Sequence, residues 1–183
     1  MTCGVLGVGD EATQLTLATG YFNLTEMYCA SLLAGRSTVT VLTAHPTANG
    51  FLGAAGPAGG IPHAYTAIAW AFHQRCSAAG QLHRVGHSVL DTASVTVMNH
   101  GQVSLHEYRR PDWTFHAKGL WVAPAPGPPC LTMVGSPNFG YRSVHRDLET
   151  QLTLFTRDPG LQVRYSCAAV SYTHLTLPTI LRV

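Results

Sequence analysis

The hydrophobic positions of this chain change their spacing along its length, from the two-residue period of strands to the longer period of helices. Residues 14–18 alternate between polar and apolar side chains, and residues 37–44 are rich in Val and Thr, so both segments predict short strands. Between them, Thr25 is suited to cap a helix over residues 26–34, and Gly35 is suited to end it. The first part of the chain is therefore predicted to run strand, helix, strand.

A longer helix and further strands are predicted after a glycine-rich loop that ends at Gly60. Pro62 suits the first turn of a helix that runs to about Ala79, where Gly80 stops it. The further strands are expected at residues 114–122, 130–136 and 148–156. The first two are joined by a run too rich in proline for the interior of a sheet. Strands that alternate with helices predict an α/β domain, in which helices flank a layered sheet.

Two segments do not fit this pattern. Residues 86–103 show no clear helix or strand period, and the chain from about Arg164 onward lacks continuity of either kind. We expect residues 86–103 and 166–183 to be poorly ordered or to pack outside the core. The domain is accordingly predicted to span residues 14–163, with 86–103 as an insertion and 164–183 as an added tail.

Composition and charge exclude several classes of protein. A length of 183 residues allows one domain with a core, and 46% hydrophobic content with a net charge of +2 excludes a highly charged disordered chain. The arginines are scattered, so no nucleic-acid partner is predicted. The five cysteines show no paired spacing, which argues against a disulfide framework and against zinc. His83 and His87 have i, i+4 spacing but no third ligand, so neither a metal nor another cofactor is predicted.

A long stretch without charge covers residues 37–74, which contain no Asp, Glu, Lys or Arg. Pro46, Pro57 and Pro62 interrupt it, so it lacks the run of about 20 apolar residues that a membrane-spanning helix needs. Two interpretations stay open: a buried strand followed by a loop and an apolar helix, or a surface that contacts lipid. The N-terminal residues match no secretory or mitochondrial presequence, so no targeting segment is expected in this chain.

Lys118 is the only lysine of the chain, and it lies two positions after His116. A lysine ammonium is a compact charge that can hold a phosphate oxygen, and a histidine can act as nucleophile or proton carrier near neutral pH. In a strand over residues 114–122, the two side chains would point to the same face. The pair therefore predicts a phosphate-binding site with an imidazole beside it.

A turn with two glycines follows at residues 135–143. Ser136 and Asn138 can donate hydrogen bonds to phosphate oxygens, and Gly135 and Gly140 would permit a close approach of the backbone. A hairpin between the two predicted strands would return this turn beside the histidine and lysine.

Charged residues after the turn add to the candidate site. Glu149 could accept a hydrogen bond from a histidine ring nitrogen and so fix the tautomer of that histidine. Arg142 and Arg146 can bind substrate phosphates, or they can pair with Asp147 and other carboxylates.

In this order and spacing, these residues resemble the phospholipase D superfamily and, within it, the phosphatidylglycerophosphate synthases. The resemblance rests on three blocks, residues 18–25, 49–62 and 113–149, and covers about residues 14–85 and 104–163. A plain phospholipase D motif carries an aspartate five residues after the lysine. Here that position is Ala123, and the second motif of the synthases is similar in lacking the aspartate.

The resemblance implies a phosphatidyltransferase of the cardiolipin pathway, associated with the mitochondrial inner membrane. In that family a histidine attacks the phosphatidyl phosphorus of CDP-diacylglycerol and expels CMP, and glycerol 3-phosphate then attacks the phosphohistidine. By resemblance, the site comprises His116 as general acid/base, Glu149 as orienting carboxylate, and a phosphate clamp of Lys118, Ser136, Asn138 and Arg142. The implied partners are the two substrates and a membrane surface that the protein contacts peripherally, with no metal required.

The family brings together two His-x-Lys motifs from two halves of one chain. This chain contains one motif and resembles the C-terminal half, so the missing N-terminal half is expected to be required for a complete site. The physical reason is that one histidine must be neutral to attack while the other is protonated to assist the leaving group. Two alternatives stay open: a phospholipase D-like phosphodiester hydrolase with one motif from each of two subunits, and an inactive fragment that binds lipid.

Overall fold

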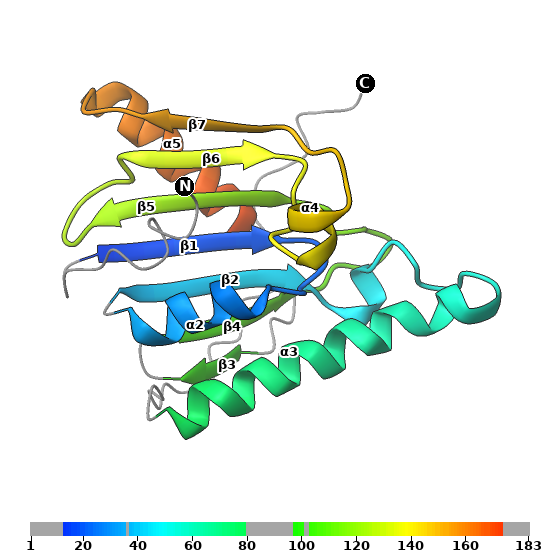
Figure 1. Cartoon of the computed structure of the whole chain (residues 1–183). Coiled ribbons are helices and arrows are strands. Elements are labelled where there is room, and N and C mark those ends of the chain that lie inside the picture. Colours follow the sequence, from blue (N-terminus) through cyan, green and yellow to red (C-terminus); the bar gives the residue numbers. More distant parts are fainter. Residues whose placement is uncertain (1–12, 36, 80–96, 101–102, 174–183) are drawn as a thin grey trace.

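Seven strands of the described residues form one mixed sheet in the order β3-β4-β2-β1-β5-β6-β7 (Figure 1). The computed structural model describes residues 13–35, 37–79, 97–100 and 103–173. The strands are β1 (Thr13–Thr19), β2 (Thr38–Ala44), β3 (Val97–His100), β4 (Val103–Tyr108), β5 (Lys118–Pro124), β6 (Leu131–Gly135) and β7 (Gln151–Phe155). β2 pairs in parallel with both β1 and β4, and every other pairing is antiparallel.

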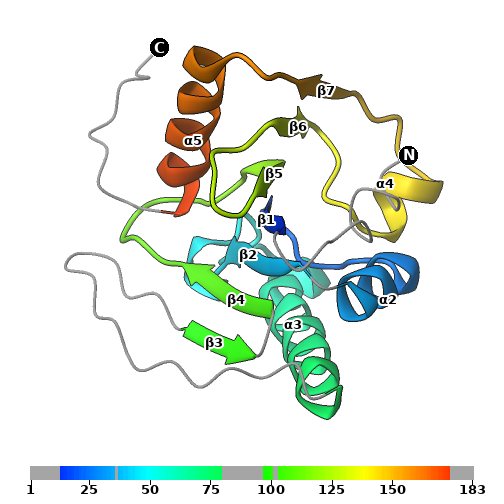
Figure 2. The same cartoon turned by 90° about the vertical axis from the view of Figure 1, so that its left-hand side faces the viewer.

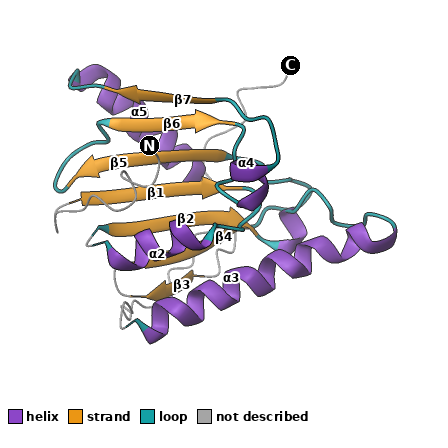
Figure 3. Cartoon of the chain, viewed as in Figure 1, coloured by secondary structure: helices purple, strands orange, loops and turns teal. Residues whose placement is uncertain are grey.

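Helices cover both faces of the sheet, which confirms the predicted α/β layered architecture. The helices are α2 (Glu26–Ala34), α3 (Ile61–Ala78), α4 (Tyr141–His145) and α5 (Pro159–Thr173), with short 3-10 turns η1 (Pro46–Ala48) and η2 (Gly56–Gly60). Figure 2 shows α2 and α3 on one face of the sheet and α5 on the other. Figure 3 shows α4 at one end of the strands, where the loop before α3 also lies.

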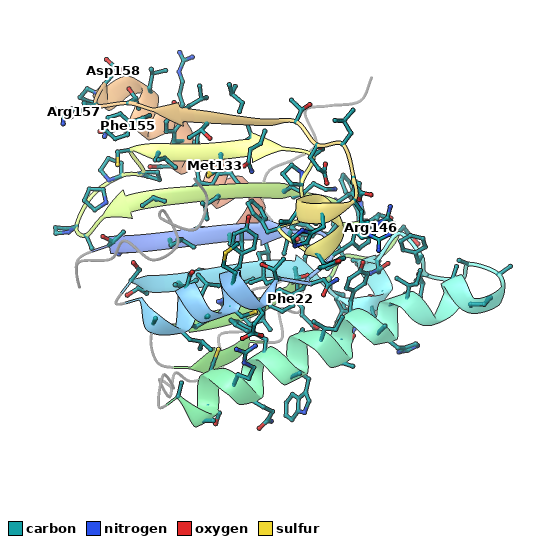
Figure 4. All side chains as sticks on the ribbon, viewed as in Figure 1. Phe22, Met133, Arg146, Phe155, Arg157 and Asp158 are labelled. Carbon is teal, nitrogen blue, oxygen red and sulfur yellow. The ribbon has the colours of Figure 1, made fainter. Side chains whose placement is uncertain are left out.

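The core between the sheet and the helices α2 and α3 depends on strand alternation. Leu17 and Val41 are fully buried beneath these helices, and Phe22 packs against Phe72 of α3 with ring centroids 5.3 Å apart (Figure 4). Burying a large apolar side chain of this kind contributes about 1.5–3 kcal/mol. A smaller cluster on the opposite face, which includes Trp121, is covered by α5. The sheet therefore has two apolar faces, each with its own helical cover.

The predicted helices α2 and α3 form because their ends carry recognisable signals. The Thr25 side chain accepts a hydrogen bond from the Tyr28 backbone N–H at 3.3 Å, as expected of an N-cap. Pro62 lies in the first turn of α3, as predicted. A bidentate ion pair between Arg75 and Glu26, at 2.8 and 2.7 Å, then joins the two helices at the surface.

Parts of the predicted insertion and tail form regular elements, and the division into insertion and tail stays a prediction. Residues 97–100 form the edge strand β3, and Val103 is buried in β4, so this end of the insertion belongs to the sheet. Residues 164–173 continue α5, whose start is capped by the Asp158 carboxylate accepting from the Leu161 N–H at 2.8 Å. Hydrophobic contact of this helix with the sheet outweighs its weak sequence pattern. Residues 86–96, 101–102 and 174–183 lie outside the described part.

Candidate active site

The site lies at the end of the sheet where the apolar pattern of the α2/α3 face changes to polar. Strand pairing places Lys118 beside Thr19, Thr19 beside Thr43, and Thr43 beside Glu107, so these four residues form one row across four strands. Thr19, Thr43 and Glu107 are all buried. A buried polar row is costly unless its groups find partners, so a row of this kind is expected at a functional site.

His116 and Lys118 lie at this end, but the strand begins later than predicted. β5 starts at Lys118 rather than at residue 114. The reason is that the Phe115 N–H donates to the Ala48 carbonyl of η1 at 2.8 Å, which holds the preceding segment against that turn and outside the sheet. The Lys118 ammonium donates back to the His116 carbonyl at 3.1 Å.

Both side chains approach one aromatic ring, that of Tyr21. The imidazole of His116 meets it edge-on with centroids 5.3 Å apart, and the Lys118 ammonium lies 5.9 Å from its centroid. A lysine within about 6 Å of an aromatic face is attracted by the ring quadrupole. The imidazole and the ammonium are thus presented on the same side of the chain.

The surroundings of the pair lower the pKa of both groups. Burial, and secondarily the charge of Lys118, lowers the pKa of His116. Burial also lowers the pKa of Lys118, while the negative charge of Glu149 acts in the opposite direction. His116 is therefore neutral at pH 7 in the free protein, which is the form that can accept a proton or attack phosphorus.

The predicted hairpin brings the glycine-containing turn to the same place. β5 and β6 pair antiparallel with Gly119 opposite Val134, so the turn that begins at Gly135 returns beside Lys118. The Ser136 hydroxyl donates a short hydrogen bond to the Glu149 carboxylate and accepts one from the Thr150 N–H at 3.0 Å.

Glu149 was predicted to orient a histidine. In the described part of the chain its hydrogen-bond partner is Ser136, and its charge also acts on Lys118 and Arg142. A contact between Glu149 and a histidine ring stays a prediction.

Asn138 is held by Thr19, the last residue of β1. The buried hydroxyl of Thr19 lies 3.0 Å from the backbone carbonyl of Asn138 and 3.4 Å from its side-chain oxygen. The Asn138 N–H donates to the Ser143 hydroxyl at 3.0 Å. Because the side-chain oxygen faces Thr19, the amide NH₂ of Asn138 stays available to donate to an anion.

The two glycines of the turn are needed for close backbone packing, as predicted. A Cβ at Gly135 would collide with the Thr150 carbonyl and lie 2.8 Å from the Cα of Gln151. A Cβ at Gly140 would lie 2.7 Å from the Asn23 carbonyl. Any larger residue would push the turn away from β7 and from the segment between β1 and α2.

Both arginines are exposed, as His116 and Ser136 also are. Arg142 pairs with Asp147 at 2.8 Å, and its side chain is 79% exposed. Arg146 lies at the end of α4, on the site side of the molecule (Figure 4). Arg142 therefore satisfies the ion-pair alternative in the free protein, and phosphate would have to compete with Asp147 for it.

Three residues of this region were missed by sequence reasoning: Thr19, Tyr21 and Glu107. For Glu107, the alternation of residues 103–108 gives a usable signal, because it places a carboxylate on the same face as the buried Val103 and Leu105. Burial raises the pKa of Glu107. No local pattern identifies Thr19 or Tyr21, since their contacts come from segments distant in the sequence.

Within the residues that the structure describes, no group of three or more His, Cys, Asp or Glu side chains could hold a metal ion. His83 and His87 lie outside those residues. No helix among the described residues is long and apolar enough to cross a membrane.

The chain is similar in sequence to mitochondrial CDP-diacylglycerol–glycerol-3-phosphate 3-phosphatidyltransferases. It is 45% identical over 159 residues to the Bos taurus protein and 44% identical over 159 residues to the Homo sapiens protein. The alignments cover 86% of this chain and 25% of each relative, so the chain spans about a quarter of their length. The Saccharomyces cerevisiae protein is 28% identical over 187 residues, covering 95% of this chain and 32% of that protein. No protein-family model matches the chain.

A solved structure shares the fold. The crystal structure of phosphatidylserine synthase from Haemophilus influenzae Rd KW20 superposes with a TM-score of 0.62 at 20% identity, over 86% of this chain and 32% of that chain. This likeness confirms the predicted phospholipase D-like arrangement of a layered sheet flanked by helices. The chain is thus homologous to about a quarter of the length of these phosphatidyltransferases, and it shares the α/β fold of the solved synthase.

Proposed function

We propose that this chain supplies one His-x-Lys half of the active site of a phosphatidyltransferase that makes phosphatidylglycerophosphate from CDP-diacylglycerol and glycerol 3-phosphate. The observation that carries the proposal is the meeting of His116, Lys118, Ser136 and Asn138 at one sheet end. The segment that builds this end is similar to enzymes named for that reaction. The similarity also supports a mitochondrial location and a role in the cardiolipin pathway.

The proposed reaction has two displacements at one phosphorus. A neutral histidine nitrogen attacks the phosphatidyl phosphorus of CDP-diacylglycerol, the bond to CMP breaks, and a proton passes to the departing CMP oxygen. The hydroxyl of glycerol 3-phosphate then attacks the phosphohistidine, loses its proton, and releases the first histidine. His116 is assigned the proton-transfer role in both steps, as acid and then as base.

The lowered pKa of His116 fits the base role directly. For the acid role, the phosphates of the bound substrate must raise this pKa, since nearby negative charge favours the protonated imidazole. An approaching diphosphate therefore prepares His116 to donate its proton.

We assign to Lys118, Ser136 and Asn138 the stabilisation of the negative charge that grows on the phosphate oxygens. Lys118 supplies a full positive charge, and the amide of Asn138 is already oriented by Thr19. Ser136 is held by Glu149, so its hydroxyl must rotate from the carboxylate to donate to substrate. Donors placed before the reaction cost little reorganisation, which is why they lower the barrier.

Complementation tests the proposal. The chain is mixed with the Bos taurus relative truncated to remove the segment aligned here, and lipid products from labelled CDP-diacylglycerol are separated with and without glycerol 3-phosphate. We expect the mixture, but neither part by itself, to form phosphatidylglycerophosphate. His116→Asn in this chain should abolish that product. His63→Asn is the matched control, because His63 is an exposed histidine of α3.

The other outcomes identify the alternatives. Phosphatidate formed without regard to glycerol 3-phosphate would favour a phosphodiester hydrolase. Lipid binding without turnover would favour an inactive fragment. Activity of the mixture that survives His116→Asn would contradict the proposed role of this histidine.

A membrane surface is proposed as the second partner. The exposed side chains of the uncharged segment include Leu52, Ile68 and Trp70, which are 59%, 37% and 52% exposed. Phe51 and Tyr65 continue this segment inward to Tyr21, beside His116. A diacylglycerol substrate must present its phosphate from a bilayer, and an uncharged apolar surface next to the site suits that geometry.

Vesicle sedimentation tests the lipid contact. We expect the chain to sediment with phosphatidylcholine vesicles that contain CDP-diacylglycerol, and the double variant Leu52→Gln/Trp70→Gln to bind them several-fold more weakly. Trp113→Gln is the control, because Trp113 is also exposed but packs under Arg110 outside this segment. Equal loss in the control would contradict a contact specific to the uncharged segment.

A further inference from the structure

We propose that Tyr21 is a positioning residue that sets the imidazole of His116 and the ammonium of Lys118 relative to each other. The inference rests on the proposed roles of these two residues, and it adds a third residue from the segment that follows β1. Tyr21 follows β1 and reaches the pair across the boundary between β1 and β5.

The geometry places the Tyr21 ring against both functional groups. His116 and Lys118 are two residues apart, and without a shared neighbour their side chains could rotate independently. The Tyr21 and His116 rings meet edge-on, with an interplanar angle of 65° and centroids 5.3 Å apart, and this contact restricts the orientation of the imidazole. The Lys118 ammonium lies 5.9 Å from the centroid of the same ring, where a cation–π interaction attracts it.

Tyr21 is itself held from its other sides. The Tyr65 ring of α3 stacks on it at 5.3 Å and 20°, and the Phe51 ring packs at 5.6 Å. Two glycines make this packing possible. A Cβ at Gly20 would lie 3.0 Å from the Phe115 carbonyl and 3.1 Å from the His116 Cα, and one at Gly50 would lie 2.9 Å from the Tyr21 hydroxyl.

The Tyr21 ring is therefore packed against two aromatic rings, Phe51 and Tyr65, while its other contacts are His116 and Lys118. The backbone of residues 115 and 116 also lies close to the preceding residue, Gly20, which limits movement of the chain at Tyr21. A ring fixed in this way can transmit its position to His116 and Lys118. An exposed ring free to rotate could not do so.

Removing the ring should change the titration of His116 in a predictable direction. Burial and the Lys118 charge both lower the pKa of His116. Without the ring, the partly covered imidazole gains further contact with water and Lys118 is free to move away, so both causes weaken and the titration midpoint should rise. The charged and titratable groups around the pair are Glu149, Tyr21, Tyr65 and Arg142, and Tyr21→Leu leaves the other three in place.

The test is an NMR titration of the His116 ring in the full chain, with His116→Gln used to assign its signal. Tyr21→Leu should raise the midpoint toward that of an unperturbed histidine, and Tyr21→Phe, which keeps the ring, should leave it unchanged. Phe22→Leu is the matched control. Phe22 is the adjacent buried aromatic and packs on Phe72, so it should lower thermal stability without moving the His116 midpoint.

A second variant keeps the test decisive if Tyr21→Leu does not fold. Tyr65→Leu removes the supporting ring only and should raise the midpoint by less than Tyr21→Leu. An unchanged midpoint in the folded Tyr21 or Tyr65 variants, or an equal shift in Phe22→Leu, would overturn the proposal.

Activity of the complemented enzyme gives a second readout. Tyr21→Leu should lower kcat about tenfold or more with a smaller change in KM, because a displacement of about 1 Å in a reacting group can cost a hundredfold. Tyr21→Phe should restore the rate. If the midpoint shifts as expected but the complemented wild type shows no turnover, the proposed function fails while the positioning role stands.

Discussion

The inner rows and the last row of the α2/α3 face differ in chemistry, although they lie on the same strands. One inner row is apolar and consists of Leu120, Leu17, Val41 and Leu105. The last row is polar and consists of Lys118, Thr19, Thr43 and Glu107. On each strand the two rows are two positions apart, so their side chains point to the same face and the same strand pairing sets the register of both rows.

The comparison shows how a functional site can share the geometry of a core without sharing its composition. The inner rows fix the register because their side chains must face the helices. The last row inherits that register and places polar groups at defined spacings, about 4.8 Å from strand to strand. Substitutions in the inner row should therefore act on stability, and substitutions in the last row on ligand affinity and its pH dependence.

The largest effect is expected from an inner-row substitution. Leu17→Ala removes a fully buried side chain and should lower the free energy of unfolding by about 3 kcal/mol, in the range observed for buried leucines. Urea denaturation followed by circular dichroism measures it. A loss below about 1 kcal/mol would mean that the inner row does not hold the fold as the comparison requires.

Lys118→Met tests the last row. It should weaken binding of glycerol 3-phosphate about 10- to 100-fold, since a hydrogen bond to a charged group is worth about 1.5–3 kcal/mol, while leaving the urea midpoint nearly unchanged. Calorimetric titration measures the affinity. Arg164→Met, an exposed cation on α5, is the control and should change neither quantity. A large loss of stability in Lys118→Met would remove the distinction between the rows.

A smaller effect should appear in the pH dependence of stability. Burial raises the pKa of Glu107 above that of an unfolded glutamate, about 4.3. The folded chain then binds more protons than the unfolded chain, so stability falls as pH rises from the unfolded to the folded pKa. Glu107→Gln should remove this fall, which urea midpoints at several pH values would show.

Glu26 is expected to affect the pH dependence of stability in the opposite direction. Its hydrogen bond with Arg75 lowers the pKa of this carboxylate, so its contribution is present above the unfolded pKa and is lost as pH falls through the folded one. Glu26→Gln should weaken the acid-side loss and leave the fall due to Glu107. The same slope in both variants would contradict the burial of Glu107 as its cause.

The smallest effect is expected outside both rows. Asp147→Asn breaks an ion pair whose side chains are 79% and 36% exposed, and it should change stability by less than about 1 kcal/mol. The same substitution frees Arg142 and should modestly strengthen phosphate binding at low salt, with the gain disappearing at high salt. Stronger binding that is insensitive to salt would contradict a screened surface contribution.

Local signals explain which parts of the fold were predictable. The Thr25 cap, Pro62 and the Val- and Thr-rich stretch gave α2, α3 and β2 with boundaries close to those observed. β4 was missed, although its residues alternate, because they adjoin a segment with no pattern. The predicted start of β5 was wrong because the Phe115 N–H donates to the carbonyl of Ala48, which is distant in the sequence. This hydrogen bond keeps the residues before Lys118 out of the sheet.

The candidate site was predictable only where one motif carried its chemistry. His116 and Lys118 stand two residues apart, and Ser136 and Asn138 share one turn, so short spacing pointed to them. Tyr21 has no such signal, since its partners come from the loop after η1, from α3 and from the segment just before β5. Residues whose role depends on packing between distant segments cannot be recognised before those segments are placed.

The bond between Thr19 and Asn138 joins positions separated by 119 residues, and this has a consequence for how the protein acquires its site. Contacts between distant positions close large loops, and chains rich in them fold slowly. The phosphate clamp cannot be complete until β1 has paired with β5 and β5 with β6. Ligand binding should therefore appear only in the last kinetic phase of refolding, so that a nascent chain cannot capture substrate before its sheet is assembled.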